Sequence, residues 1–150
     1  MSARLVIAAD YVLSRDSAVG WTEVARLPGG AGALLPAGRV SISDAHMEAA
    51  IERAEDWLMP HAAALQGEVL EVLDESGRLA AGLRAGYAAG ATEWDTDEWE
   101  ALFLRVVDRV LGPRAALQPE EPAFIADVLL LRELAHHGRL QKLQILPQPA

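Results

Sequence analysis

The longest stretch that is apolar on nearly every side covers residues 122–137, PAFIADVLLLRELAHH. Apolar residues recur in it at the three- and four-residue spacing of a helix, on adjoining stripes. Its charged residues ahead of the two closing histidines are Asp127, Arg132 and Glu133. A helix that is apolar almost all round is buried, and sixteen residues span only roughly 24 Å, too short for a bilayer. The pattern therefore predicts a buried central helix and not a membrane span.

A second helix is predicted over residues 44–65. Its apolar residues follow a regular three-four repeat, and Ser43 or Asp44 stands at the N-cap position. Pro60 falls inside the repeat. Because proline has no backbone N–H and its ring meets the preceding turn, we expect the helix to kink or restart there.

A third helix is predicted over residues 95–111, and its start is the strongest local signal in the chain. Asp95 at the N-cap and Glu98 three residues later have the spacing of a capping box. Trp94 and Trp99 occupy the two positions of a hydrophobic staple. A glycine followed by a proline ends the pattern, as is usual at a helix C-terminus.

The first 43 residues carry strand patterns. Residues 4–13 are a mostly apolar run, typical of a strand buried on both faces, and residues 21–26 and 39–43 alternate between apolar and polar positions. The glycine-rich segment between the last two lacks the lysine of a phosphate loop and the spacing of a dinucleotide motif. A flexible turn is the favoured interpretation of that segment.

Residues 68–84 fit two structures. A turn from Asp74 to Gly77 would make them a strand–turn–strand hairpin, whereas the helical spacing of their leucines and valines would make them two helices. The turn chemistry of the aspartate and the glycine favours the hairpin.

Together these patterns predict an α+β fold in a single globular domain over residues 1–150. A small, mainly antiparallel sheet is built from the first 43 residues and the 68–84 hairpin, and it is covered by three main helices, at about 44–65, 95–111 and 122–137. The alternative is a mostly α-helical bundle.

Composition narrows the classes of function. The chain has 150 residues, no cysteine and a net charge of −9, with a pI near 4.8. The absence of cysteine excludes disulfides, cysteine–zinc sites and thiol catalysis, and with no signal peptide pattern it favours a cytoplasmic protein. An acidic field argues against nucleic acid and anionic membranes as partners. One lysine against twelve arginines and no asparagine indicates a GC-rich bacterial genome.

A candidate metal site lies at the end of the longest apolar stretch. Glu133 and His136 have the Glu-x-x-His spacing that places a carboxylate and an imidazole on one helix face, and His137 adjoins them. Carboxylate-bridged dimetal sites need a second such pair, which the sequence lacks. Histidines in a last turn also interact favourably with the helix dipole, so no metal and no cofactor are predicted.

A weak interaction candidate lies at the start of the third helix, in EWDTDEWE. Trp94, Asp95, Asp97 and Glu98 could dock a cation or a peptide. Acidic residues in a first turn are favoured by the helix dipole, so the structural interpretation is preferred.

For function, the sequence favours a non-enzymatic binding or accessory protein that acts on a protein partner through an acidic surface, as chaperones and immunity proteins do. The basis is the absence of a recognised nucleophile, metal set or phosphate loop. The alternative is a small enzyme or small-molecule-binding protein with a pocket near Pro60 or near His136 and His137. The closing segment at residues 139–146 could be a last short strand or an apolar arm. A homodimer is also predicted, because the apolar helix and such an arm offer more apolar surface than we expect the chain to cover internally.

Overall fold

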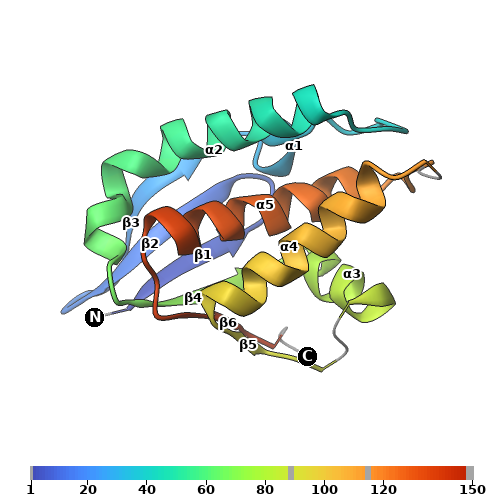
Figure 1. Cartoon of the computed structure of the whole chain (residues 1–150). Helices are drawn as coiled ribbons and strands as arrows, with labels where there is room; N and C mark the ends of the chain where they lie inside the picture. Colours follow the sequence, from blue (N-terminus) through green and yellow to red (C-terminus); the bar gives the residue numbers. More distant parts are fainter. Residues whose placement is uncertain (1, 88–89, 114–115, 148–150) are drawn as a thin grey trace.

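The computed structural model describes residues 2–87, 90–113 and 116–147 (Figure 1). The elements in chain order are β1 (Ala3–Ile7), β2 (Tyr11–Ser17), β3 (Gly20–Leu27), α1 (Ala31–Leu34), α2 (Asp44–Leu65), β4 (Val69–Asp74), α3 (Arg78–Gly86), β5 (Glu93–Trp94), α4 (Thr96–Val110), α5 (Glu121–His137) and β6 (Lys142–Ile145). Within those ranges, none of the helices has the length and apolar character needed to cross a membrane.

The strands form one six-stranded sheet in the order β3-β2-β1-β4-β6-β5. The pairs β1–β2, β2–β3 and β5–β6 are antiparallel, whereas β4 is parallel to both of its neighbours, β1 and β6. The predicted α+β class is confirmed. The sheet is larger than predicted, because strands from the C-terminal half of the chain join it.

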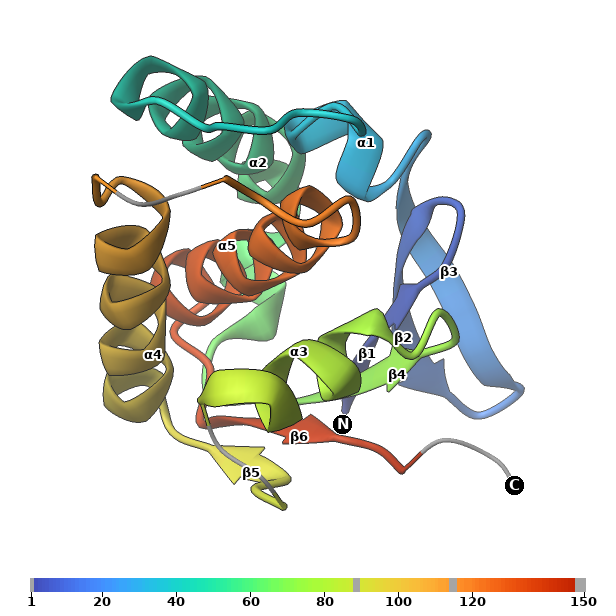
Figure 2. The same ribbon diagram turned by 90° about the vertical axis from the view of Figure 1, so that its right-hand side faces the viewer.

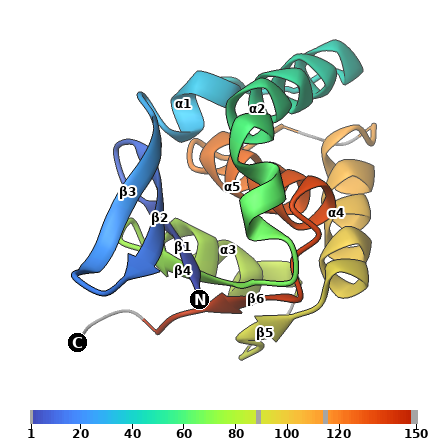
Figure 3. The ribbon, with the colours of Figure 1, turned by 90° about the vertical axis from the view of Figure 1, so that its left-hand side faces the viewer.

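The sheet buries one face. In β1, Ala3, Leu5 and Ile7 are fully buried, whereas the residues between them are partly exposed, and β4 and β6 alternate in the same way. Figures 2 and 3 show α1, α2, α4 and α5 gathered on one side of the curved sheet. The hydrophobic core therefore lies between the sheet and the helices.

Helix α5 occupies the centre of the helical layer (Figure 2). It contacts α1, α2, α3 and α4, and 12 of its 17 residues are buried. The indole N–H of Trp99 in α4 donates to the carbonyl oxygen of Val128 in α5 at 3.1 Å, which fixes how the two helices face each other. The prediction of a buried central helix is confirmed.

The predicted helix starts are confirmed as well. Ser43 caps α2 by accepting the backbone N–H of His46. At α4, Asp95 accepts the N–H of Glu98 at 2.7 Å and the Glu98 carboxylate accepts the N–H of Asp95 at 2.9 Å, a complete capping box. Caps depend on residues three positions apart, so they can be identified in the sequence.

Two further local predictions concern Pro60 and the tryptophan staple. Helix α2 is continuous through Pro60 and does not restart there, but its C-terminal turns run in a different direction from its first turns (Figure 3). Trp94 packs edge-to-face against Trp99 with ring centroids 5.2 Å apart, as a staple requires.

Two strand predictions in the first 43 residues are wrong. Residues 4–13 contain two strands, because the chain reverses between Ile7 and Tyr11, where the Ala8 N–H donates to the Asp10 carbonyl oxygen. Because the turn contains alanines, it continues the apolar run and cannot be recognised in the sequence. Residues 39–43 alternate but form no strand. The Leu117 N–H donates to the Val40 carbonyl oxygen, and among the described residues no further bond of this kind extends the pairing. The glycine-rich segment also contains a short helix, α1, in place of a flexible turn alone.

The 68–84 hairpin is also wrong, since the segment is strand β4 followed by helix α3. The first half pairs in parallel with β1 and β6, which come from distant parts of the sequence, and not with a local return strand. The Asp74 carboxylate accepts backbone N–H groups from Ser76, Gly77 and Leu79, and these bonds order the start of a helix. An aspartate before a glycine serves a hairpin turn and a helix start equally well.

The surfaces that motivated self-association are used inside the chain. Helix α5 is covered by the other helices, and residues 142–145 of the closing segment form β6 within the sheet, which confirms the short strand and not the apolar arm. A homodimer stays a prediction, but the apolar surfaces from which it was inferred are covered within the chain.

We predict that Gly82→Ala destabilises the protein by about 1–3 kcal/mol, the usual cost of overpacking. A Cβ at Gly82 would overlap the Phe124 ring, so either the ring or the two helices α3 and α5 would have to move. Gly86→Ala in the same helix is the matched control, because a Cβ there meets nothing within 4 Å. The free energy of unfolding in urea should fall for the first variant and stay level or rise for the second. Equal effects of the two substitutions would contradict the close packing of α3 on α5.

Candidate functional site

A cavity of about 940 Å³ lies between α3, α4 and the first turn of α5. Its walls include Arg78 at the start of α3, Tyr87 just after that helix, Arg105 and Arg109 on α4, and Phe124 on α5. The cavity adjoins the turn that follows the carboxyl end of β4, a strand with two parallel neighbours. Ligands of open sheets with parallel strands commonly bind beyond the carboxyl ends of those strands.

The backbone N–H groups of the turn between β4 and α3 are hydrogen-bonded by side chains of the same turn. Asp74 is buried and accepts three backbone N–H groups and the Ser76 hydroxyl. The hydroxyl oxygen of Ser76 accepts the Arg78 N–H in turn. The N–H groups of residues 76–79 are therefore already bonded, so we expect a ligand in the cavity to be bound mainly by side chains.

The wall between the cavity and the core contains a buried charge network. Asp127 on α5 is fully buried and accepts two bonds from Arg78, at 2.8 and 2.9 Å, and one from the hydroxyl of Tyr11. Burial raises the pKa of Asp127 to about 6, although the adjacent guanidinium favours the charged form. Burial, and secondarily the nearby carboxylate, raises the pKa of Tyr11 well above its usual value. The network fixes the Arg78 side chain in one position at the edge of the cavity.

An aromatic pair and two further arginines also line the cavity. The rings of Tyr87 and Phe124 stack with centroids 5.9 Å apart. The Arg105 guanidinium lies 5.2 Å from the centre of the Tyr87 ring and donates to the carbonyl oxygens of residues 86 and 87. Arg109 forms a two-bond ion pair with Glu121. Burial raises the pKa of the Tyr87 hydroxyl, so this group is a neutral hydrogen-bond donor near neutral pH.

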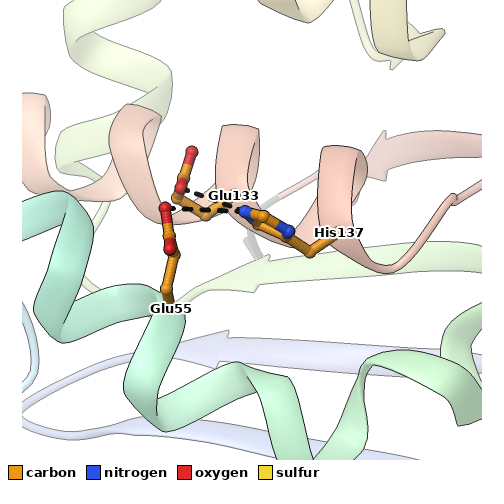
Figure 4. Close-up of side chains that lie close together, drawn as sticks. All are labelled: Glu55, Glu133 and His137. Atoms are coloured by element: carbon orange, nitrogen blue, oxygen red, sulfur yellow. Dashed lines mark ion pairs between the residues drawn. The ribbon is translucent and has the colours of Figure 1, made fainter.

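A second constellation joins α2 to the C-terminal part of α5. The side chains of Glu55, Glu133 and His137 converge, with one potential ligand atom of each within 4.8 Å of the others (Figure 4). Nε2 of His137 lies 3.6 Å from Oε1 of each carboxylate. Glu133 is fully buried, and burial together with the Glu55 carboxylate raises its pKa, against the lowering effect of Arg132.

The structure brings together two of the three metal candidates from the sequence. Glu133 and His137, four residues apart, share a helix face. His136 is exposed and lies outside this group; its ring is edge-on to the His137 ring, with the ring centroids 5.0 Å apart. Their third partner, Glu55, was missed, because no sequence spacing links α2 to α5. Pro60 does not line the cavity between α3, α4 and α5.

The interaction candidates at the start of α4 have structural roles. Trp94 is buried, and Asp95 and Glu98 complete the capping box. Asp97 lies in the first turn and is exposed, where the helix dipole favours a negative charge. A docking role for these residues stays a prediction.

The cavity residues were not identified from the sequence. Asp127 gave a usable signal, since it is a carboxylate in the middle of an otherwise apolar helical stretch, and such a group needs a buried partner. Arg78, Arg105 and Tyr87 gave none, because arginines and tyrosines on helices or in loops are usually ordinary surface residues.

No family model matches this sequence, and the search of curated proteins also found no match. Solved structures do resemble the fold. Three structures from Aquifex aeolicus, described as a member of the Ppx/GppA protein family, a Ppx/GppA phosphatase and a PPX-GPPA enzyme, each align over 98% of this chain. Their TM-scores are 0.59, 0.60 and 0.65, and their sequence identities are 13%, 12% and 11%, in that order. The chain spans about half of those proteins, 52% in the first and 54% in the other two. At this identity the likeness shows the fold.

This finding corrects the functional prediction. A non-enzymatic accessory protein acting through protein–protein contacts is the wrong main interpretation, since the chain has the fold of about half of an enzyme described as a phosphatase. The sequence held no catalytic motif to counter that interpretation. The alternative, a small enzyme or a small-molecule-binding protein, agrees better with the fold, although the cavity described above lies neither near Pro60 nor near His136 and His137.

We predict that Asp127→Asn changes how stability depends on pH. Because the pKa of Asp127 is about 6 in the folded protein and 3.8 in the reference state, this carboxyl stabilises the fold fully below pH 3.8 and loses that contribution as the pH rises through 6. The variant does not titrate, so its free energy of unfolding should rise relative to the original protein between pH 4 and pH 7, by on the order of 3 kcal/mol.

Urea unfolding at several pH values measures this difference. Asp10→Asn is the control: Arg26 and the Gly29 N–H lower the pKa of Asp10, so that substitution should give no such rise in this range. A constant difference between Asp127→Asn and the original protein would contradict a raised pKa at Asp127.

Proposed function

We propose that this chain binds a small phosphorylated molecule in the cavity between α3, α4 and α5. The observation that carries the proposal is the cavity itself, in which an arginine without an acidic partner among the described residues lies beside an aromatic pair. Its volume of about 940 Å³ falls in the range of small-molecule sites, roughly 300–1,000 Å³.

Arg105 is the group best suited to a phosphate. It makes no ion pair with any residue in the described ranges, whereas Arg78 and Arg109 are paired with Asp127 and Glu121. Its present bonds to two carbonyl oxygens are 3.3 Å long, and the side chain is exposed, so exchanging them for a phosphate requires little rearrangement. Hydrogen bonds between a guanidinium and a phosphate are charge-assisted and can be bidentate.

The charge of the lining limits the kind of phosphate. Three arginines face Asp108, Glu120 and Glu121 in the same cavity, so its formal charges cancel. The whole chain carries a net charge of −9. A long polyphosphate would be repelled, whereas a ligand with one phosphate, a ring for the Tyr87 and Phe124 wall and hydroxyl or amino donors for the carboxylates would be complemented.

The comparisons support this choice of ligand class. One of the resembling structures is described as a phosphatase, and a phosphatase acts on a phosphorylated compound. This chain spans about half of their length. Binding of the phosphate ester is therefore the main proposal, and its hydrolysis is a second step that the experiment below tests separately. The cytoplasmic location expected from the composition stays a prediction.

We predict that 4-nitrophenyl phosphate binds to the chain and that Arg105→Ala weakens its binding by about 10-fold to 100-fold, since a hydrogen bond to a charged group contributes about 1.5–3 kcal/mol. Arg84→Ala is the matched control, because Arg84 is an exposed arginine of α3 outside the cavity lining. Calorimetry measures binding, and release of coloured nitrophenolate measures hydrolysis in the same samples. Tripolyphosphate should bind more weakly than the monoester.

The binding proposal fails if millimolar 4-nitrophenyl phosphate does not bind, or if Arg105→Ala and Arg84→Ala bind it equally well. Binding without nitrophenolate release would limit the chain to a binding role.

A further inference from the structure

We infer that Glu55, Glu133 and His137 bind a divalent metal ion of the zinc class. Glu133 and His137 are four residues apart on α5 and therefore share one face of the helix. Glu55 reaches them from α2, which packs against α5 (Figure 4). The three side chains supply one nitrogen and two carboxylate oxygens that lie within 4.8 Å of one another.

The distances fit ligands around an ion better than direct hydrogen bonds. Nε2 of His137 lies 3.6 Å from Oε1 of Glu55 and 3.6 Å from Oε1 of Glu133. Hydrogen bonds from nitrogen to oxygen are about 2.7–3.2 Å long, so neither contact is one. In a tetrahedral zinc site with bonds of about 2.0–2.2 Å, neighbouring ligand atoms are about 3.3–3.6 Å apart.

A buried oxygen points to the same conclusion independently. Glu133 is fully buried, and its Oε1 has no hydrogen-bond partner among the described residues. This is the oxygen that faces Glu55 and His137. A buried carboxylate oxygen without a donor is unfavourable, and a cation between the three side chains would satisfy it.

The other oxygen of Glu133 is fixed in place. Oε2 accepts a bond from Nη1 of Arg132, and that arginine is bound through two further bonds to Glu100 of α4, at 2.7 and 3.2 Å. Such outer partners orient the ligands of metal sites. The arginine and the packing of α5 thus keep Oε1 directed at the cluster.

The ligand types favour zinc over magnesium or calcium. Imidazole nitrogen suits zinc and neighbouring transition metals, whereas magnesium and calcium prefer six or more oxygen ligands. Three protein ligands leave one tetrahedral position for water. The side chains of Glu55 and His137 are 40% and 27% exposed, so an ion can reach the cluster from solvent.

The cluster is separate from the cavity. Phe124 lines the cavity and Glu133 belongs to the cluster, and nine residues of helix between them correspond to about 14 Å along the axis. The metal inference therefore does not depend on the proposed ligand of the cavity.

The test is a calorimetric titration with zinc chloride of chelator-treated protein that carries no histidine tag. We expect one equivalent to bind with micromolar or tighter affinity, and magnesium chloride to give no binding at the same concentration. His137→Ala and Glu55→Gln should weaken zinc binding by 100-fold or more. His136→Ala is the matched control, because His136 is an exposed neighbour outside the cluster, and it should bind zinc like the original protein.

Thermal unfolding gives a second measurement, since an ion that binds only the folded state raises the melting temperature. The rise should occur in the original protein and in His136→Ala but not in Glu55→Gln, a change of nearly equal size at a partly exposed side chain that leaves the fold intact. The inference is overturned if zinc does not bind, or if His137→Ala and Glu55→Gln bind it as well as His136→Ala does. Binding of 4-nitrophenyl phosphate in Glu55→Gln should be unchanged, which separates this test from that of the cavity.

Discussion

The burial of two carboxylates on one helix is the constraint on which much of this structure depends. Asp127 and Glu133 are both fully buried on α5, a helix that is otherwise apolar over most of its surface. An ionised carboxylate in an apolar interior is destabilising by several kcal/mol unless it is paired and hydrogen-bonded. Each is met by an arginine, Arg78 from α3 and Arg132 from α5 itself.

These pairs also tie neighbouring helices to α5. The ion pair of Arg78 with Asp127 joins the start of α3 to the middle of α5, and the bonds of Arg132 to Glu100 join α4 to the same helix. The first arrangement forms one wall of the cavity between α3, α4 and α5. The second orients Glu133 toward Glu55 and His137. The same charged groups that join these helices thus determine where both candidate sites lie.

The fold and the sites support function in different ways. The likeness to the Aquifex aeolicus structures, at 11–13% identity and over about half of their length, concerns the arrangement of strands and helices. It contradicts the accessory-protein interpretation by showing a fold that is also found in an enzyme. The proposed class of ligand rests on the side chains of this chain, above all on Arg105 beside the stacked rings of Tyr87 and Phe124.

The sequence by itself determined the features that depend on neighbouring residues. The three-four repeat of residues 44–65, the capping box of Asp95 and Glu98 and the apolar stripes of residues 122–137 were sufficient for the three long helices, because a helix is organised by contacts three or four residues apart. Only the tertiary structure decided that β4 lies between β1 and β6, and that Glu55 meets Glu133. Contacts between residues far apart in the chain leave no periodic trace in a single sequence, since they arise from how whole elements pack against one another.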